Sequence, residues 1–170
     1  CRDKDRDVRE TVARNPGASP SDLRRLLGDS DRRVRWAVAA NPSLDARLRS
    51  VMAQAKDKEL RGLAAEMPEL EPEMAALLIE DVSPEVRERL AAHTRDAEIM
   101  AAMLRDRTVR VRKGLAINPR LSAEQRHKLA QDSSPDVRAT LVRAQRLDEA
   151  DLRELLHDRS AEGRRSLAAS

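Results

Sequence analysis

The sequence contains almost no aromatic residues: Phe and Tyr are absent, and Trp36 is the one tryptophan among 170 residues. We therefore expect a hydrophobic core of aliphatic and alanine side chains, built from many small contacts. The shortage also disfavours a helical-repeat DNA glycosylase, because such enzymes stack bases on several aromatic side chains.

Features of several other protein classes are missing as well. No apolar run approaches the roughly 20 residues of a membrane helix, no signal peptide is present, and no glycine-rich phosphate loop occurs. The single cysteine, Cys1, cannot form an internal disulfide, which is typical of a cytoplasmic protein. His93, His127 and His157 lack metal-ligand spacing, and no His-Glu pairs appear, so a di-iron hydroxylase is disfavoured. The sequence predicts a protein that is not an enzyme.

An apolar residue followed by arginine recurs along the whole chain, at steps of 26, 26, 26, 25, 26 and 26 residues. We call the first residue of each pair the anchor of its repeat; the anchors are Val8, Val34, Leu60, Val86, Val111, Val137 and the degenerate Gly163. Units of this length are too short to bury their own apolar face, so neighbouring units must bury it. The period predicts a single helical-repeat domain over residues 1–170, folded as an α-solenoid.

The segment that begins at each anchor is predicted to be an α-helix. An aliphatic residue or alanine stands four residues after each anchor, and the residue that follows it is small, which gives one apolar face. Asparagine followed by proline ends this segment at Asn15, Asn41 and Asn118. We expect these asparagines to adopt the left-handed conformation, and the prolines to stop the helix.

The second half of each repeat carries apolar residues spaced by three and four, such as Leu23, Leu26 and Leu27. These segments are only about two turns long, so the spacing fits an α-helix or a 3₁₀ helix. The fifth repeat is a weak copy, because Gln125 and Lys128 stand where the other repeats have aliphatic residues. Ser122 with Gln125 predicts a capping box at the start of this segment.

The pattern DxxxxVRxxVAxNP followed by a leucine pair resembles the leucine-rich repeat variant family, a bacterial repeat family similar in style to HEAT repeats. The resemblance covers essentially all 170 residues, although the third, fourth and sixth repeats depart from it at the Asn-Pro stop. It implies an all-α, right-handed superhelix of alternating α and 3₁₀ helices in two layers. It implies no catalytic activity, because the family has no common biochemical function.

The resemblance also bears on Cys1. A related bacterial protein joins such repeats to an upstream iron–sulfur module, and the chain, which starts without Met, is expected to be a fragment or a processed product. Cys1 is then either an inert terminal residue, the last thiolate ligand of an upstream 4Fe-4S cluster, or a lipidated terminus. Since a four-iron cluster usually needs four cysteines, we expect no metal or cofactor within this chain.

Arginine and aspartate keep fixed positions in nearly every repeat. The anchor pairs contribute Arg9, Arg35, Arg61, Arg87, Arg112 and Arg138, and the position five residues before the anchors holds acids that include Asp29, Asp81, Asp106 and Asp132. Ala55 is the exception. These fixed positions predict a structural ladder of charge-assisted hydrogen bonds between arginines and aspartates. The predicted partner of Arg87 is Asp81 or Asp106. We also expect the aspartates to accept hydrogen bonds from free backbone amides where the next helix begins. The alternative is an arginine row that binds phosphates, which the matched aspartates would neutralise.

Charge and the lone tryptophan supply the remaining functional evidence. Residues 1–50 hold 12 basic and 8 acidic side chains, residues 51–100 hold 6 and 12, and residues 101–170 hold 15 and 10. Trp36 occupies a repeat position that is otherwise polar or small, so it is either a ring lying across the adjacent repeat or a partner contact. The leading hypothesis is a non-enzymatic scaffold with a protein partner along its concave surface. The alternatives are nucleic-acid binding through the basic ends and a repeat domain of an iron–sulfur protein.

Overall fold

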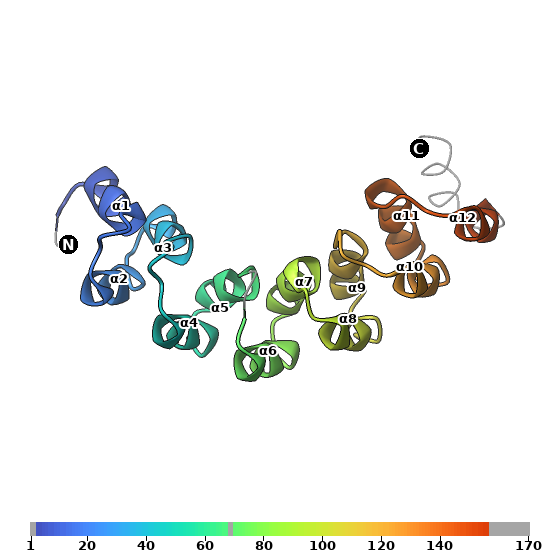
Figure 1. Ribbon diagram of the computed structural model, residues 1–170, viewed down its shortest axis with the longest axis horizontal. Coiled ribbons are helices and arrows are strands. Elements are labelled where there is room, and N and C mark those ends of the chain that lie inside the picture. Colours follow the sequence, from blue (N-terminus) through green and yellow to red (C-terminus); the bar gives the residue numbers. More distant parts are fainter. Residues whose placement is uncertain (1–2, 68–69, 157–170) are drawn as a thin grey trace. The chain divides into compact units, whose positions relative to one another are not determined.

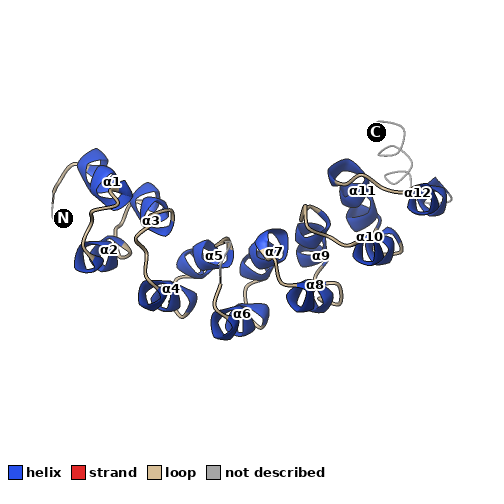
Figure 2. Cartoon of the chain, viewed as in Figure 1, coloured by secondary structure: helices blue, strands red, loops and turns tan. Residues whose placement is uncertain are grey.

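The computed structural model describes residues 3–67 and 70–156, which contain twelve helices and no strand (Figures 1 and 2). The predicted all-α repeat fold is therefore confirmed. The chain divides into two compact units, Cys1–Leu78 and Ile79–Ser170. Cys1, His157 and the degenerate seventh anchor, Gly163, lie outside the described residues.

The first helix of each repeat contains the anchor within its first turns. These helices are α1 (Arg6–Arg14), α3 (Arg32–Ala39), α5 (Lys58–Ala65), α7 (Pro84–His93), α9 (Val109–Ala116) and α11 (Pro135–Ala144). Asp5, Asp31 and Asp57 cap the first three of them, each accepting a hydrogen bond from a backbone amide of the first turn. Pro84 and Pro135 occupy the first turn of α7 and α11, where a missing amide hydrogen costs nothing.

The second helix of each repeat is α-helical. These helices are α2 (Pro20–Leu26), α4 (Ala46–Ala53), α6 (Pro72–Ile79), α8 (Ala97–Met103), α10 (Ala123–Ala130) and α12 (Glu149–Leu156). The alternation with 3₁₀ helices that the family resemblance implied is wrong for the described residues. Seven or eight residues exceed the length that 3₁₀ geometry usually sustains, and bonds such as Leu27 N to Leu23 O, at 2.9 Å, span four residues. The capping box of Ser122 and Gln125 at the start of α10 is confirmed.

In the first unit the helices form two layers, with α1, α3 and α5 in one layer and α2, α4 and α6 in the other (Figure 1). Helix α3 packs against α1 and α5, and α2 packs against α1 and α3. The fully buried side chains include Leu23, Val34, Val38 and Met52. Val8, the anchor of the first repeat, is exposed, because no helix among the described residues precedes α1.

The second unit repeats this arrangement. Helix α9 packs against α7 and α11, while α8 and α10 cover it from the second layer (Figure 1). Gly114 marks the closest approach, because a Cβ atom there would lie 2.6 Å from the backbone oxygen of Glu88 on α7. Contacts between a helix and the next but one, as in α1 with α3, α3 with α5, α7 with α9 and α9 with α11, are those of a helical solenoid.

The predicted left-handed conformation at the Asn-Pro stops is wrong. No described residue other than glycine has a positive φ, and Asn15 has a φ of −68°. The extended backbone that a residue before proline prefers ends the helix without a left-handed turn. Val51 on α4 and Leu77 on α6 belong to the apolar residues spaced by three and four in the second segments, yet both are exposed.

Candidate functional site

Each anchor-pair arginine binds the loop that precedes its own helix. Its Nη1 donates to the backbone oxygen of the residue six positions earlier, over 2.5 to 3.1 Å. The arginines that do so are Arg9, Arg35, Arg61, Arg87, Arg112 and Arg138. The guanidinium group therefore ties the start of the helix to the loop before it.

In three of these arginines, the other edge of the guanidinium binds an aspartate of the following repeat. The bidentate pairs are Arg9 with Asp29 (2.7 and 3.1 Å), Arg87 with Asp106 (2.7 and 3.2 Å) and Arg112 with Asp132 (2.6 and 3.0 Å). Such paired, charge-assisted bonds are stronger and more directional than single neutral ones. In the fourth repeat Arg87 meets both candidates, the carboxylate of Asp106 and the backbone oxygen of Asp81.

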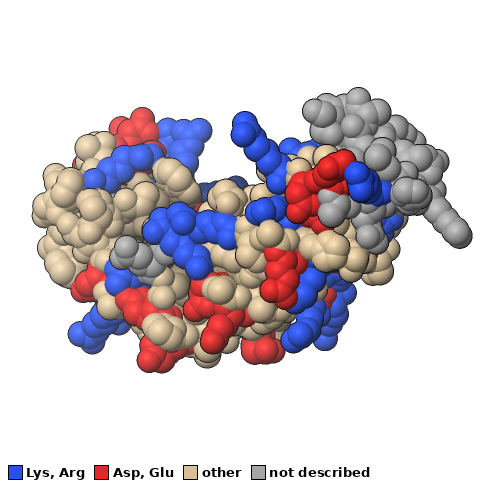
Figure 3. All heavy atoms as spheres, turned by 45° about the vertical axis from the view of Figure 1, so that its right-hand side comes forward, with Lys and Arg blue, Asp and Glu red and all other residues tan. Residues whose placement is uncertain are grey.

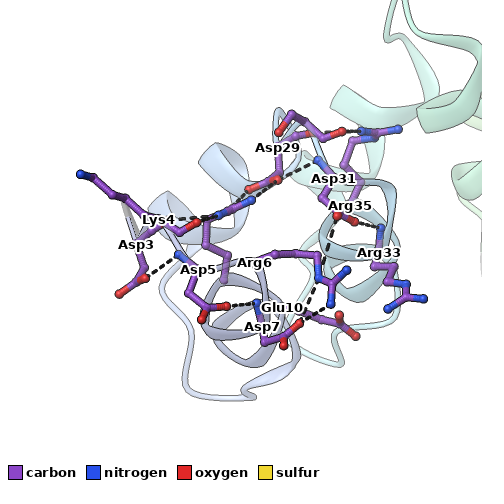
Figure 4. A network of polar contacts seen from close by, with 12 residues as sticks. Asp3, Lys4, Asp5, Arg6, Asp7, Glu10, Asp29, Asp31, Arg33 and Arg35 are labelled. Atoms are coloured by element: carbon purple, nitrogen blue, oxygen red, sulfur yellow. Dashed lines mark hydrogen bonds and ion pairs between the residues drawn. The ribbon is translucent and has the colours of Figure 1, made fainter.

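The acids of this ladder also shape the loops. In Asp29, Asp81, Asp106 and Asp132, Oδ1 accepts the backbone amide two residues later, over 2.8 to 2.9 Å, and that residue is the N-cap of the next helix. The hydrogen bonds from Arg9 and from the Asp31 amide hold the pKa of Asp29 below its ordinary value, although burial acts against them. Asp29 lies in the loop that leads to α3, close to Asp31 (Figure 4).

Arg35 has no aspartate available in the next repeat, because Ala55 occupies that position. Glu59, in the first turn of α5, pairs with Arg35 and also with Arg32, the latter at 2.7 Å. The longer glutamate side chain reaches the guanidinium from a position on the helix instead of the loop. Glu59 was not predicted as a partner from the sequence, because it does not stand at the fixed position five residues before the anchor.

A second set of hydrogen bonds links adjacent repeats through side-chain amides, and the sequence pattern did not predict it. The side-chain amide of Asn41 donates to the oxygens of Ala13 (2.6 Å) and Asn15 (2.9 Å), in the preceding repeat. In the other unit, Asn118 donates to the oxygens of Ala91 and Thr94, at 2.8 and 3.0 Å. These asparagines are buried and satisfy carbonyl groups at the end of the neighbouring helix.

Gln145 performs the same task from one position further along the chain. Its Nε2 donates to the oxygens of Ala116 and Asn118, each at 3.0 Å. Helix α11 extends to Ala144, and the extra methylene of glutamine allows its amide to reach the same carbonyl groups. The sequence carries a signal for these bonds: an asparagine or glutamine recurs seven or eight residues after the anchor, at Asn41, Asn118 and Gln145.

Trp36 is the exposed aromatic side chain of the structure, with 46% of its surface accessible. It lies on α3, and the guanidinium carbon of Arg14, on α1, is 5.5 Å from the centre of its ring. At this distance a cation is attracted to the face of an indole. Glu10 holds Arg14 in place through an ion pair of 2.8 Å.

Two hollows meet at this ring, and we call them together the Trp36 surface. The first has a volume of about 440 Å³ and is lined by Trp36 with Glu10, Arg14, Arg32 and Arg33. The second, of about 200 Å³, is lined by Trp36 with Ala39, Ala40, Leu63, Glu66 and Met67. The ring therefore separates a mainly basic hollow next to α1 from a mainly apolar hollow next to α5.

Arg33 is the cation of this surface with no ion-pair partner among the described residues. Its backbone amide binds Asp31, but its guanidinium points away from the surrounding network (Figure 4). Basic and acidic side chains also occur together on the face that Figure 3 shows. The first unit thus offers an aromatic ring and an available positive charge side by side.

The two histidines that the structure describes, His93 and His127, have different partners. His93 Nδ1 donates to the backbone oxygen of Arg89, at 2.9 Å, whereas His127 Nδ1 lies 2.8 Å from a carboxylate oxygen of the buried Asp151. Across residues 3–67 and 70–156, no three His, Cys, Asp or Glu residues are grouped so that they could hold a metal ion. In the same ranges no helix is long and apolar enough to cross a bilayer.

Repeated pairs of α-helices, linked through arginine and amide ladders, define an all-α helical-repeat protein. Residues 6–31 match the family model described as leucine rich repeat variant. A solved structure, described as a leucine-rich repeat variant with a novel repetitive protein structural motif, matches 98% of the chain at 27% identity, with a TM-score of 0.64. The chain spans 66% of the length of that protein. No match was found among curated proteins.

The chain is therefore similar to the leucine-rich repeat variant family in its first repeat, and to a solved structure of that description over nearly all of its length. That similarity agrees with the repeated pairs of helices described above.

Proposed function

We propose that the chain is a non-enzymatic scaffold that binds a protein partner through the Trp36 surface. The supporting observation is the half-exposed ring of Trp36 between two hollows. Tryptophan and arginine are enriched among the residues that contribute most to protein–protein binding. A ring that Arg14 already holds in position loses little conformational entropy when a partner covers it.

The chemistry of the two hollows indicates what the partner segment contains. An acidic side chain fits beside Arg33, and an aliphatic or aromatic side chain fits the hollow floored by Ala39, Ala40 and Leu63. The ring of Trp36 would pack against the backbone between them. We therefore expect a short segment in which an acidic residue is followed or preceded closely by an apolar one.

The structure offers less to nucleic acid. The guanidinium groups of Arg9, Arg87 and Arg112 are already bonded to carboxylates, so the row that repeats most regularly is neutralised. Phosphate binding at these positions would require breaking those bonds. The iron–sulfur alternative depends on Cys1, which lies outside the described residues.

The test is site-specific cross-linking. A photo-reactive amino acid replaces Ala40, which is exposed on the Trp36 surface and leaves the ring in place, and Ile117, which is exposed on the other unit, receives the same group as a matched control. We expect one protein to be cross-linked at position 40 and not at 117, as identified by mass spectrometry. Equal adducts at both positions would contradict the proposal.

The identified partner is then titrated against purified Trp36→Ala. Its affinity should fall roughly 30-fold, the effect of a hot-spot residue worth about 2 kcal/mol. Loss of a half-buried ring should cost at most about 1–2 kcal/mol of folding stability, so circular dichroism should show a folded variant. Because Trp36 is the only tryptophan and tyrosine is absent, its fluorescence also reports binding directly.

A further inference from the structure

A hollow between the second helices of the fourth and fifth repeats lies entirely within the second unit. It has a volume of about 360 Å³ and is lined by Arg95, Ala97, Met100, Ala101, Leu104, Arg120, Ser122, Glu124, Gln125 and Lys128. We call it the α8–α10 groove. Its volume is at the lower end of ligand-binding pockets and fits a few side chains.

The groove has an apolar floor. Ala97 and Ala101, four residues apart on α8, are exposed, so small side chains leave the helix surface accessible. Met100 is buried beneath them, and Leu104 closes the floor at the end of the helix. Exposed methyl groups above a buried methionine provide a shallow apolar surface for an aliphatic side chain.

The opposite wall is polar where the repeat pattern makes it apolar. Gln125 and Lys128 occupy the two positions that are aliphatic in each of the other repeats, from Leu23 and Leu26 in the first onward. Both line the groove. The second and third repeats expose Val51 and Leu77 at the position of Lys128, so the lysine replaces no core contact there and adds a polar wall to the groove.

Two arginines at the groove have no side-chain partner among the described residues. Arg95 precedes α8 and Arg120 precedes α10, and both are exposed. Lys128 is paired with Glu124, at 2.7 Å. The groove therefore presents two uncompensated positive charges beside an apolar floor.

We propose that the α8–α10 groove binds an acidic segment of a partner protein, with carboxylates on Arg95 and Arg120 and an aliphatic side chain on the alanine floor. Charge complementarity favours an acidic occupant. The apolar floor and Glu124 favour a peptide over a polyphosphate, because phosphates would gain nothing from the methyl groups and would be repelled by the carboxylate. This site shares no residue with the Trp36 surface and does not depend on it.

The probe is a random peptide library displayed on phage and selected against the full chain. Selections run in parallel on the wild type and on the double variant Arg95→Glu/Arg120→Glu, which changes only exposed, unpaired side chains. We expect the peptides retained by the wild type alone to be net acidic and to contain an aliphatic residue. Peptides without acidic residues, or an identical selection on both proteins, would overturn the proposal.

One selected peptide is then synthesised and titrated by fluorescence anisotropy. Arg95→Glu/Arg120→Glu and Ala101→Trp, which fills the floor, should each weaken binding at least about tenfold. The matched control Arg146→Glu reverses an exposed, unpaired arginine outside the groove and should change binding less than about twofold. Trp36→Ala should leave it unchanged, so failure at one surface is distinguishable from failure at the other.

Two further measurements separate other occupants. Binding of random-sequence duplex DNA that the double reversal abolishes would assign the groove to nucleic acid. Self-association in sedimentation velocity that the double reversal abolishes would assign it to a second copy of the chain. Either result would overturn the acidic-peptide proposal, whereas unchanged DNA binding and a monomer in both proteins would support it.

Discussion

Replacing Arg87 with alanine tests whether the arginine ladder holds adjacent repeats together. The side chain of Arg87 is 6% exposed and that of Asp106 is 9% exposed, so the substitution leaves a buried carboxylate without its cation. It also removes the bond to the backbone oxygen of Asp81, at 2.5 Å. Breaking a buried ion pair on one side typically costs about 3–5 kcal/mol.

We expect the loss at the lower end of this range, about 3 kcal/mol, because Asp106 still accepts the amide of Thr108. The matched control is Arg110→Ala. Arg110 crosses from α9 to α7 as well, pairing with Glu85 and Glu88, but its side chain is 52% exposed. An exposed ion pair contributes at most about 1 kcal/mol, so the two variants differ chiefly in burial.

The assay is equilibrium unfolding in urea, followed by far-ultraviolet circular dichroism. Urea is uncharged and does not screen ion pairs, whereas guanidinium chloride would. The double variant Arg87→Ala/Asp106→Asn should be more stable than the sum of the two single losses predicts, because the neutral amide that replaces the carboxylate leaves no buried charge unpaired. A loss below about 0.5 kcal/mol for Arg87→Ala, or one equal to that of Arg110→Ala, would refute a structural role for the ladder.

Three further predictions concern backbone packing, the amide bonds and acid stability. Gly114→Ala should cost roughly 1–3 kcal/mol in urea unfolding, because its Cβ would meet the backbone oxygen of Glu88, whereas Gly28→Ala, with its nearest atom at 3.5 Å, should be nearly neutral. Asn118→Ala should cost about 2–3 kcal/mol by leaving buried carbonyl groups unpaired, and the exposed Asn15 is its control; equal losses would contradict the assigned role. Burial raises the pKa of Asp106, but the bonds from Arg87 and the Thr108 amide outweigh it and the pKa is lowered overall. Such a carboxylate stabilises the fold above its unfolded pKa of about 3.9, and this stability is lost as the pH falls through the folded pKa. The free energy of unfolding should therefore drop below about pH 4. The drop should be less steep in Asp106→Asn than in the wild type, because the variant lacks this carboxylate.

Local features of the fold were predictable from the sequence because they depend on residues close together in the chain. The four-residue spacing from Val34 to Val38 defines one helical face, and both side chains are buried. Ser122 and Gln125 are three residues apart, so their capping box follows from helix geometry alone. The same reasoning failed at Asn15, where the residue before proline adopts an extended conformation.

The candidate binding sites were only partly predictable. Trp36 stood out by composition, yet its hollows require α1 and α5 to flank α3. Gln125 and Lys128 were recognisable as departures from the repeat, but their meaning depends on the exposed alanines of α8 across the groove. A sequence pattern identifies unusual residues and does not show which surface they share.

By itself, the sequence determined the repeat period, the helical faces and the recurrence of arginine and aspartate in each unit, since all of these are set by spacing within about 26 residues. The tertiary structure decided which groups meet: Arg9 binds the aspartate of the following repeat, Glu59 replaces the acid missing at Ala55, and Asn41 reaches carbonyl groups of the preceding repeat. These partners depend on the offset and rotation between neighbouring repeats. That geometry results from packing side chains across the interface, which no spacing along a single repeat encodes.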